Sequence, residues 1–238
     1  MKRFLFLLIM CLFFTSCQKG ESVREVLLNP SLAEYDENIG SAAKGFSEKS
    51  FKPLSNHYWL DSDKPKYMQL YYKSGNGSHA SGAEIGGFFA EYNKENNKWI
   101  IKAQATSFTE NGSWGEAPVP VFIKLGPESY GFMMEPAGGG QGFTEHTLFL
   151  YGVVGKNFVQ LLSIPTYSDN SGTGSPDSFT VKVNLSQAID YSKSYYDLIA
   201  RLSIEGKYPM SPDDEYAKMF GKSKEVRFIF KDGVYTSR

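Results

Sequence analysis

The sequence predicts a mainly β protein, built as an antiparallel sandwich or a strongly curved sheet with two or three short helices. An α+β arrangement is the alternative. About ten segments alternate apolar and polar residues with the period of two that a half-buried strand requires. Glycine, asparagine or aspartate borders many of these segments, and helical signals are few. The strand segments show no repeat of constant length, which argues against a propeller.

The first residues of the chain have the pattern of a secretory signal peptide. Lys2 and Arg3 form a short basic patch, the apolar run 4–14 follows, and small residues come directly before Cys17. An apolar run of about eleven residues is too short to cross roughly 30 Å of hydrocarbon. The pattern therefore predicts export and removal of this segment.

The sequence Phe14-Thr15-Ser16-Cys17 resembles the lipobox of bacterial lipoprotein precursors, although Phe14 stands where Leu, Val or Ile is usual. The resemblance implies cleavage before Cys17, a diacylglyceryl group on its sulfur and acylation of its amino group. The lipid bilayer would then be the first partner of the chain. Gln18 is not Asp, which by the same resemblance implies the outer membrane and a periplasm-facing domain. For the location, the alternatives are the inner membrane and the cell surface. For the lipobox, the alternative is an ordinary signal peptide with a chance cysteine.

The chain accordingly divides into a signal peptide over residues 1–16, a lipidated flexible tether over residues 17–50 and a single β-rich domain over residues 51–238. Within the tether, Ser31-Leu32-Ala33-Glu34 fits a capping box, and a short helix there would end at Gly40 or Gly45.

Composition excludes several classes of function. The chain has 25 basic and 26 acidic residues, a balance that argues against nucleic acid and against a polybasic membrane face. Of its two cysteines, Cys11 lies in the signal peptide and Cys17 would carry lipid. The mature chain would thus have no disulfide and no thiol for catalysis, and no cofactor is expected.

Several strands can be placed in order along the chain. Residues 85–92 and 99–106 alternate on either side of the polar stretch 93–98, which predicts a hairpin. Residues 147–154 leave neither face polar, so this strand should lie at the centre of the sheet system. Gly155-Lys156-Asn157 then turns the chain into a further strand. Other alternating segments are 119–125, 130–134, 179–185 and 226–230.

The clearest helical signal is Ser211-Pro212-Asp213-Asp214-Glu215, in which Ser211 can cap, Pro suits the first position and the carboxylates complement the helix dipole. Gly221 should end this helix. Residues 195–204 fit a helix or a strand, and strand is favoured. Asp232-Gly233 marks a tight turn near the end of the chain.

The glycine-rich stretch 135–142 predicts a wide bend between strands, since no lysine and no helix follow as in a phosphate loop. Glu145 and His146, together with Glu135, are candidates for acid and base chemistry or for ligand binding. Neighbouring strand residues point to opposite faces, however, so only one of Glu145 and His146 should face a given pocket.

Two loops offer further candidates. Trp114 lies among turn residues and would either stack on a sugar or a protein partner, or fold back over the core, which is favoured. The stretch 169–177 imitates a calcium loop but lacks its closing glutamate, so no metal site is predicted; Asp169 and Asp177 would be the ligands if calcium bound. The three histidines have no zinc-site spacing.

These observations lead to a hypothesis of function. The sequence favours a bacterial envelope lipoprotein with a non-catalytic β-rich domain that binds an envelope protein or glycan. One alternative is an immunity or inhibitor lipoprotein that acts on a toxin or hydrolase through residues 109–117. The other is an envelope hydrolase of glycan or peptide that uses Glu135 or Glu145 with His146.

Overall fold

The structure is a computed structural model that describes residues 36–60, 64–75 and 81–238. Its described part is mainly β, with two antiparallel sheets, so the predicted fold class is confirmed. The four-stranded sheet is a meander in the order β1-β2-β3-β4. Its strands are β1 (Lys52–Trp59), β2 (Lys66–Lys73), β3 (Ala83–Asn93) and β4 (Lys98–Asn111).

The nine-stranded sheet has the order β13-β12-β11-β10-β9-β8-β6-β5, and β7 pairs with β8 beside this path. Strand β13 contacts β9 although three strands separate them in the sheet, so the sheet is strongly curved. Its strands are β5 (Val121–Gly126), β6 (Ser129–Met134), β7 (Ala137–Gly140), β8 (Phe143–Val154), β9 (Asn157–Asp169), β10 (Phe179–Ala188), β11 (Asp197–Gly206), β12 (Glu225–Lys231) and β13 (Val234–Ser237).

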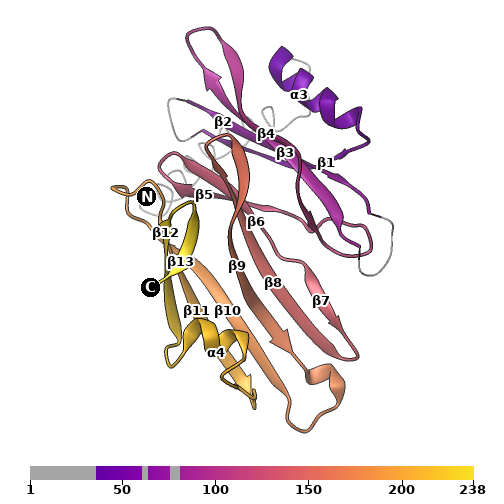
Figure 1. The fold of residues 1–238 in the computed structure, drawn as a ribbon, viewed down its shortest axis with the longest axis vertical. Coiled ribbons are helices and arrows are strands. Elements are labelled where there is room, and N and C mark those ends of the chain that lie inside the picture. Colours follow the sequence, from indigo (N-terminus) through magenta and orange to yellow (C-terminus); the bar gives the residue numbers. More distant parts are fainter. Residues whose placement is uncertain (1–35, 61–63, 76–80) are drawn as a thin grey trace, which may run out of the picture.

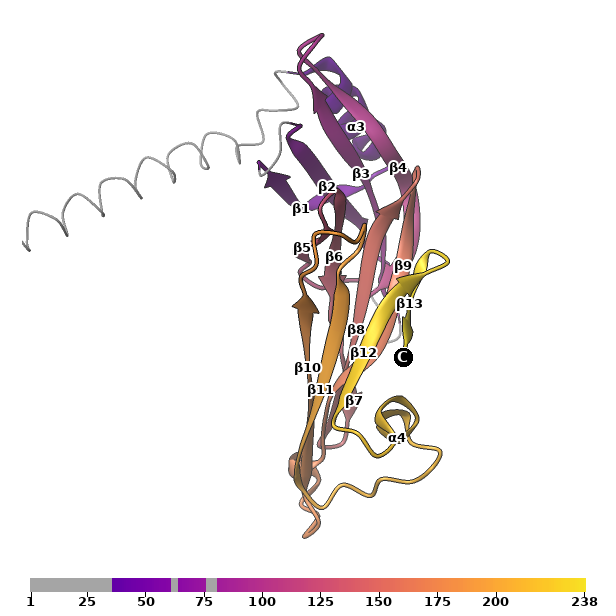
Figure 2. The same ribbon diagram turned by 90° about the vertical axis from the view of Figure 1, so that its left-hand side faces the viewer.

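In the part of the chain that the structure describes, two α-helices lie far apart on this framework. Helix α3 (Glu37–Ser47) accompanies the four-stranded sheet at one end of the elongated molecule, and α4 (Glu215–Phe220) lies near the other end (Figure 1). A single 3₁₀ turn, η1 (Ser171–Thr173), follows β9. The side view in Figure 2 shows the same separation. Within the described ranges, neither helix has the length and apolar character needed to cross a bilayer.

The predicted hairpins are present. Strands β3 and β4 pair in antiparallel fashion through a turn in which Asn97 has a φ of 52°. Gly155, with a φ of 62°, makes the turn between β8 and β9. Strand β8 lies between β6 and β9, with Leu148 in one apolar core and Phe149 against the other. The prediction that this strand is covered on both faces is therefore correct.

Three apolar cores hold the layers together. The first lies between α3 and the outer face of the four-stranded sheet. The second joins the inner face of that sheet to the nine-stranded sheet, and includes Met68, Phe89 and Phe132. The third lies inside the curve of the nine-stranded sheet, where α4 contributes Tyr216 and Phe220. Both faces of the four-stranded sheet are thus buried.

A buried lysine also connects the two sheets. Lys66 on β2 is only 3 % exposed, and its ammonium lies 2.5 Å from Glu91 on β3 and 3.2 Å from Glu128 in the turn between β5 and β6. Burial by itself would raise the pKa of Glu91, but the hydrogen bond and charge of Lys66, helped by Lys102 and Lys64, lower it overall. The positive charge of Lys66 thus stabilises the ionised form of Glu91.

Helix α3 corrects the predicted tether. Residues 36–50 were expected in a flexible segment, yet Ile39, Ala42 and Phe46 are buried on the four-stranded sheet. Their spacing of three and four residues places them on one helical face, and this packing carries the helix through Gly40 and Gly45. The prediction that Gly40 or Gly45 ends a helix in this segment is also wrong. The signal peptide, Cys17 and the capping box at Ser31 lie outside the described residues.

Two further expectations need correction. Strand β1 was not predicted, because a register shift between Pro53 and Ser55 breaks its alternation. Helix α4 is capped by Asp214 rather than by Ser211. The carboxylate of Asp214 accepts hydrogen bonds from the backbone amides of Tyr216 and Ala217. Gly221 ends this helix as predicted, with a φ of 55°. Residues 195–204 fall largely in β11, so the favoured strand assignment is correct.

Candidate functional site

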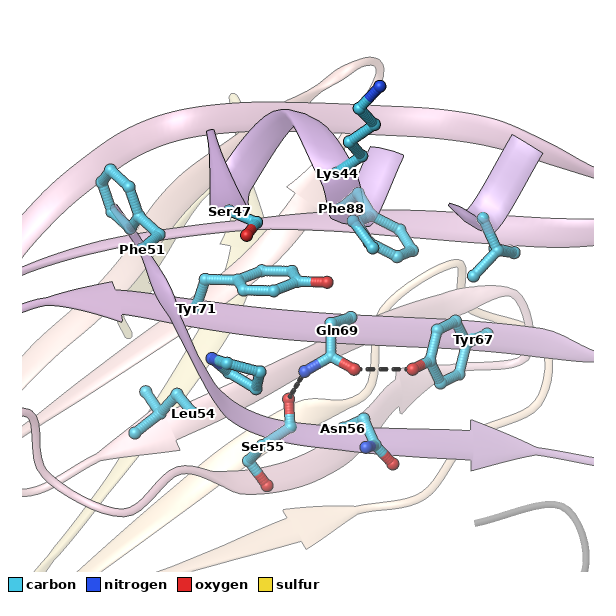
Figure 3. Close-up of a pocket in the computed structure, with 13 residues that line it drawn as sticks. Lys44, Ser47, Phe51, Leu54, Ser55, Asn56, Tyr67, Gln69, Tyr71 and Phe88 are labelled. Carbon is cyan, nitrogen blue, oxygen red and sulfur yellow. Dashed lines mark hydrogen bonds between the residues drawn. The ribbon is translucent and has the colours of Figure 1, made fainter. Parts of the chain in front are cut away.

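A cavity of about 630 Å³ lies between helix α3 and strands β1 and β2 (Figure 3). We call it the α3 cavity. Its volume falls in the range of roughly 300–1,000 Å³ that is typical of small-molecule sites. It is lined by Ile39, Ala43, Lys44, Ser47, Phe51, Pro53, Leu54, Ser55, Asn56, Tyr67, Gln69, Tyr71 and Phe88.

The floor of the cavity comes from one face of β2. Successive strand residues point to opposite faces, so Tyr67, Gln69 and Tyr71 face α3 while Met68 and Leu70 enter the core between the sheets. A strand with this alternation has one face for packing and one face with hydroxyl and amide groups. That second face supplies hydrogen-bonding groups to the cavity.

Gln69 is held in a fixed orientation. Its Nε2 donates to the carbonyl oxygens of Ser55 and Leu70, each at 3.1 Å, and its Oε1 accepts from the hydroxyl of Tyr67 at 2.6 Å. The contact with Ser55 crosses from β2 to the irregular part of β1, where the register shifts. Both amide hydrogens of Gln69 are therefore used, and its oxygen retains one acceptor position.

Tyr71 is the central aromatic side chain of the floor. Phe46 of α3 stacks on its ring, with centroids 4.3 Å apart and planes inclined by 3°. Burial raises the pKa of Tyr71 to about 12, so its hydroxyl stays neutral at ordinary pH. Burial, with smaller contributions from Tyr58 and Tyr71, also raises the pKa of Tyr67. The cavity thus presents neutral phenol groups.

Helix α3 is fastened to the sheet along the side of β4. The carboxylate of Asp36 accepts from the amides of Asn38 and Ile39 through Oδ1 and from the amide of Trp99 through Oδ2. The side-chain amide of Asn38 donates to the carbonyl oxygen of Trp99 at 2.7 Å. At the other end, Lys49 donates to the Thr106 hydroxyl at 3.1 Å. The α3 cavity lies on the opposite side of the helix, above β1.

Comparison of the chain with protein-family models, with curated proteins and with solved structures finds no match. The site is therefore interpreted from its own chemistry. A mostly apolar, partly open cavity with a few fixed polar groups has the general character of a ligand-binding site.

Glu145 and His146 line a second, smaller cavity of about 190 Å³ beside α4, together with Tyr208 and Asp214. The ring of His146 packs against Tyr167, with centroids 5.1 Å apart. Burial raises the pKa of Tyr208, helped by the hydrogen bond to Asp214 and by the charges of Asp214 and Glu145. Glu145 and His146 thus line one cavity together, so the prediction that only one of them would face a given pocket is wrong. The pairing of β8 with β9 shifts register between His146 and Thr147, which interrupts the strict alternation of side chains at this point.

The third candidate for acid and base chemistry, Glu135, lies just before the glycine-rich stretch. The hydroxyl of Thr166 donates to its carboxylate and also lies 3.3 Å from the carbonyl oxygen of His146. Thr166 thus connects Glu135 with the backbone of His146, not with its imidazole. The glycines 138–140 belong to β7, an exposed strand paired with β8, so this stretch forms a short hairpin arm and not only a bend.

The acidic residues of the calcium-like loop are occupied by protein groups. Asp169 accepts from the amide and hydroxyl of Ser171 and from the hydroxyl of Thr180, and these hydrogen bonds lower its pKa. Asp177 pairs with Lys207 at 2.6 Å. Among the described residues, no three histidine, cysteine, aspartate or glutamate side chains are grouped as a metal site requires.

Trp114 lies in the connection between β4 and β5. It has a φ of 56° and is 59 % exposed, so the favoured expectation that it folds back over the core is wrong. Trp114 lies between the two residues of the bridge formed by Ser113 and Glu116, within a tight turn. An exposed indole on a tight turn is available to a partner.

The sequence prediction did not include the residues of the α3 cavity. Tyr67, Gln69 and Tyr71 were covered only by the general period of two, and residues 37–47 were assigned to the tether. One signal was present: β2 alternates Met68 and Leu70 with larger, hydrogen-bonding side chains. Such an alternation on a strand that is buried on both faces indicates a polar lining under a covering element.

Proposed function

We propose that this protein is a lipid-anchored protein of the bacterial envelope whose β-rich part binds a small, largely apolar molecule in the α3 cavity. The anchor would be acylated Cys17, and the binding domain would act without chemical turnover. The observation that supports binding is the cavity of about 630 Å³ between α3 and β2, with an aromatic floor and a fixed Gln69.

The geometry supports binding in this cavity for two reasons. Its apolar walls offer a ligand the free energy of leaving water, about 25 cal/mol for each Å² of apolar surface buried. Its floor is rigid, since Phe46 stacks on Tyr71 and Gln69 is fixed by three hydrogen bonds. A preformed site avoids part of the entropic cost of ordering side chains around the ligand.

Binding can be tested with Nile red, a neutral dye that fluoresces in apolar surroundings. Ser47 lines the cavity from α3, so Ser47→Trp should fill it and abolish the fluorescence increase. The matched control is Ser41→Trp, which places the same indole at an exposed position of α3 that does not line the cavity. Equal dye binding by both variants would contradict the proposed site.

The anchor can be tested separately by metabolic labelling with a palmitate analogue. The wild-type precursor should incorporate the label and fractionate with membranes. The Cys17→Ala variant should remain unlabelled. Label in both proteins would contradict acylation at Cys17.

The exposed Trp114 favours a second candidate function, in which the connection between β4 and β5 contacts a protein partner as an inhibitor or immunity protein would. Envelope extract should then yield a captured protein with the wild type but not with Trp114→Ala. Capture that is unchanged by this substitution would remove Trp114 from the interface.

A further inference from the structure

We propose that the α3 cavity selects an uncharged amphiphile, a molecule with an apolar body and a hydroxyl or carbonyl group at its polar end, such as a long-chain alcohol or a monoacylglycerol. This inference rests on the proposed function, because it names the class of ligand for the same cavity. It follows from how apolar, neutral polar and charged groups are distributed around the cavity.

One end of the cavity is mostly apolar, although the hydroxyl of Ser47 lies beside Phe51 there (Figure 3). Figure 3 shows Phe51 and Leu54 together on one side, and Pro53 also lines the cavity. Phe51 packs edge-on against Phe46, with centroids 5.9 Å apart, which fixes its ring. An alkyl chain or other apolar body would be removed from water at this end.

The other end carries neutral hydrogen-bonding groups. The hydroxyl of Tyr71 points toward the end where Gln69 and Tyr67 lie, and Asn56 reaches the same region from β1 (Figure 3). Tyr71 can donate and accept, the Asn56 amide can do both, and Gln69 keeps one acceptor position. A ligand hydroxyl or carbonyl would find both a donor and an acceptor here.

The cavity has no suitable partner for a charged head group. Lys44 is the only charged residue among those that line it. Its side chain is 77 % exposed, lies 3.7 Å from Glu48, and points away from the Tyr71 hydroxyl in Figure 3. A carboxylate or ammonium placed beside Tyr71 would lose hydration without gaining an opposite charge. The cavity should therefore discriminate against both signs of charge.

The selectivity can be measured with three molecules that share a ten-carbon chain: decanol, decanoate and decylammonium. Each would displace Nile red from the whole protein near pH 8, where the acid and the amine are both charged. We expect decanol to bind at least roughly tenfold more tightly than either ion, because the ions pay for desolvation.

Two substitutions identify the groups responsible. Tyr71→Phe removes one hydroxyl and retains the ring that stacks on Phe46, so decanol should lose several-fold more affinity than Nile red, which needs no hydroxyl partner. The control is Tyr72→Phe on the next position of β2, where the side chain has the opposite direction and does not line the cavity. Lys44→Gln should keep the preference for decanol over both ions, because the Lys44 ammonium points away from the Tyr71 hydroxyl.

The outcomes separate this inference from the proposed function. The selectivity would be overturned if decanoate or decylammonium bound as tightly as decanol, or if none of the three displaced Nile red. It would also be overturned if decanoate binding depended on Lys44, or if Tyr71→Phe left decanol binding unchanged. Binding of Nile red that remains sensitive to Ser47→Trp would in each case leave the proposed site in place. Loss of that sensitivity would overturn both.

Discussion

Helices α3 and α4 cover their sheets in different ways. Helix α4 inserts Tyr216 and Phe220 into the curve of the nine-stranded sheet and becomes part of its core. Helix α3 is almost twice as long, with 11 residues against 6, and buries Ile39, Ala42 and Phe46, yet a cavity of about 630 Å³ remains at its side. The longer helix therefore covers its sheet less completely.

The difference arises from where each helix is attached. Asp36 and Asn38 hold α3 to the backbone of Trp99 on β4, at one edge of the four-stranded sheet. The cavity forms at the other side of the helix, above β1, where Ser55 follows a register shift. A helix held along one side can cover a binding site, whereas one packed into the centre of a core contributes to stability. The following predictions test this contrast.

The largest effect should come from removing the anchoring ring of each helix. Phe46→Ala and Phe220→Ala should each lower the free energy of unfolding by about 3–5 kcal/mol, since both side chains are buried. Only Phe46→Ala should also abolish Nile red binding, because Phe46 supports Tyr71. Urea unfolding followed by circular dichroism, with dye titration of the folded fraction, measures both. A Phe46→Ala protein with normal dye affinity would contradict the contrast.

The caps should give the next largest effect. Asp36→Ala and Asp214→Ala should each cost about 1–2 kcal/mol of stability, because each carboxylate accepts from two helix amides. Asp36 also accepts from Trp99, so its loss should loosen α3 and weaken Nile red binding. Asp214→Ala serves as the matched control and should leave dye binding unchanged. Equal effects on dye binding would show that the attachment to β4 does not position α3.

Alkaline titration should distinguish the surroundings of the two sites. The pKa of Tyr71 is raised to about 12 by burial, whereas charge from Asp214 also contributes to the raised pKa of Tyr208. Asp214→Asn should therefore lower the pKa of Tyr208, and Lys44→Gln should not change that of Tyr71. Tyrosinate absorbance, assigned with Tyr71→Phe and Tyr208→Phe, tests this. A shift of Tyr71 in Lys44→Gln would reveal a charge at the cavity.

The same shift has a consequence for stability. The folded-state pKa of Tyr71 lies above the value of about 10 expected in the unfolded chain. Its contribution to stability is therefore complete below about pH 10 and is lost as the pH rises to about 12. In Tyr71→Phe, stability should fall less steeply across this interval, as measured by urea unfolding at several pH values.

The smallest effects should come from one glycine in each helix, and they should have opposite signs. Gly45 lies inside α3 and an added Cβ would meet nothing within 4 Å, so Gly45→Ala should stabilise by about 0.5–1 kcal/mol. Gly221 ends α4 with a φ of 55°, so Gly221→Ala should destabilise by about 1 kcal/mol. Thermal unfolding measures both. Destabilisation by Gly45→Ala would mean that α3 needs flexibility at this point.

Strands were predictable from the sequence wherever alternation persists without interruption. Strand β10 is the clearest case, because Phe179, Val181 and Val183 are buried while Lys182 and Asn184 are exposed. Strand β1 could not be predicted in this way, because its alternation is interrupted. The extra residue near Pro53 exchanges the two faces of the strand for the side chains that follow. Helix α3 could not be predicted either, because Gly40 and Gly45 give the segment a low helix propensity, and packing on the sheet outweighs it.

The candidate site was less accessible to sequence reasoning. The cavity depends on residues far apart in the chain, as in the bond between Gln69 and Ser55 and the stacking of Phe46 on Tyr71. No local pattern encodes the gap that remains beside a helix. The sequence did mark Glu145 and His146 as candidates, but the rule of alternating directions separated two residues that line one cavity. The register shift beside His146 is not visible in the sequence.

The contact between Asp36 and Trp99 has one more consequence. Strand β4 is an outer strand, and the amide and carbonyl of Trp99 point outward, where they would otherwise be open to pairing with a strand of another molecule. Asp36 and Asn38 occupy both groups with side chains, which cannot extend a sheet. The start of this helix thereby prevents a strand of another molecule from pairing with β4 at Trp99.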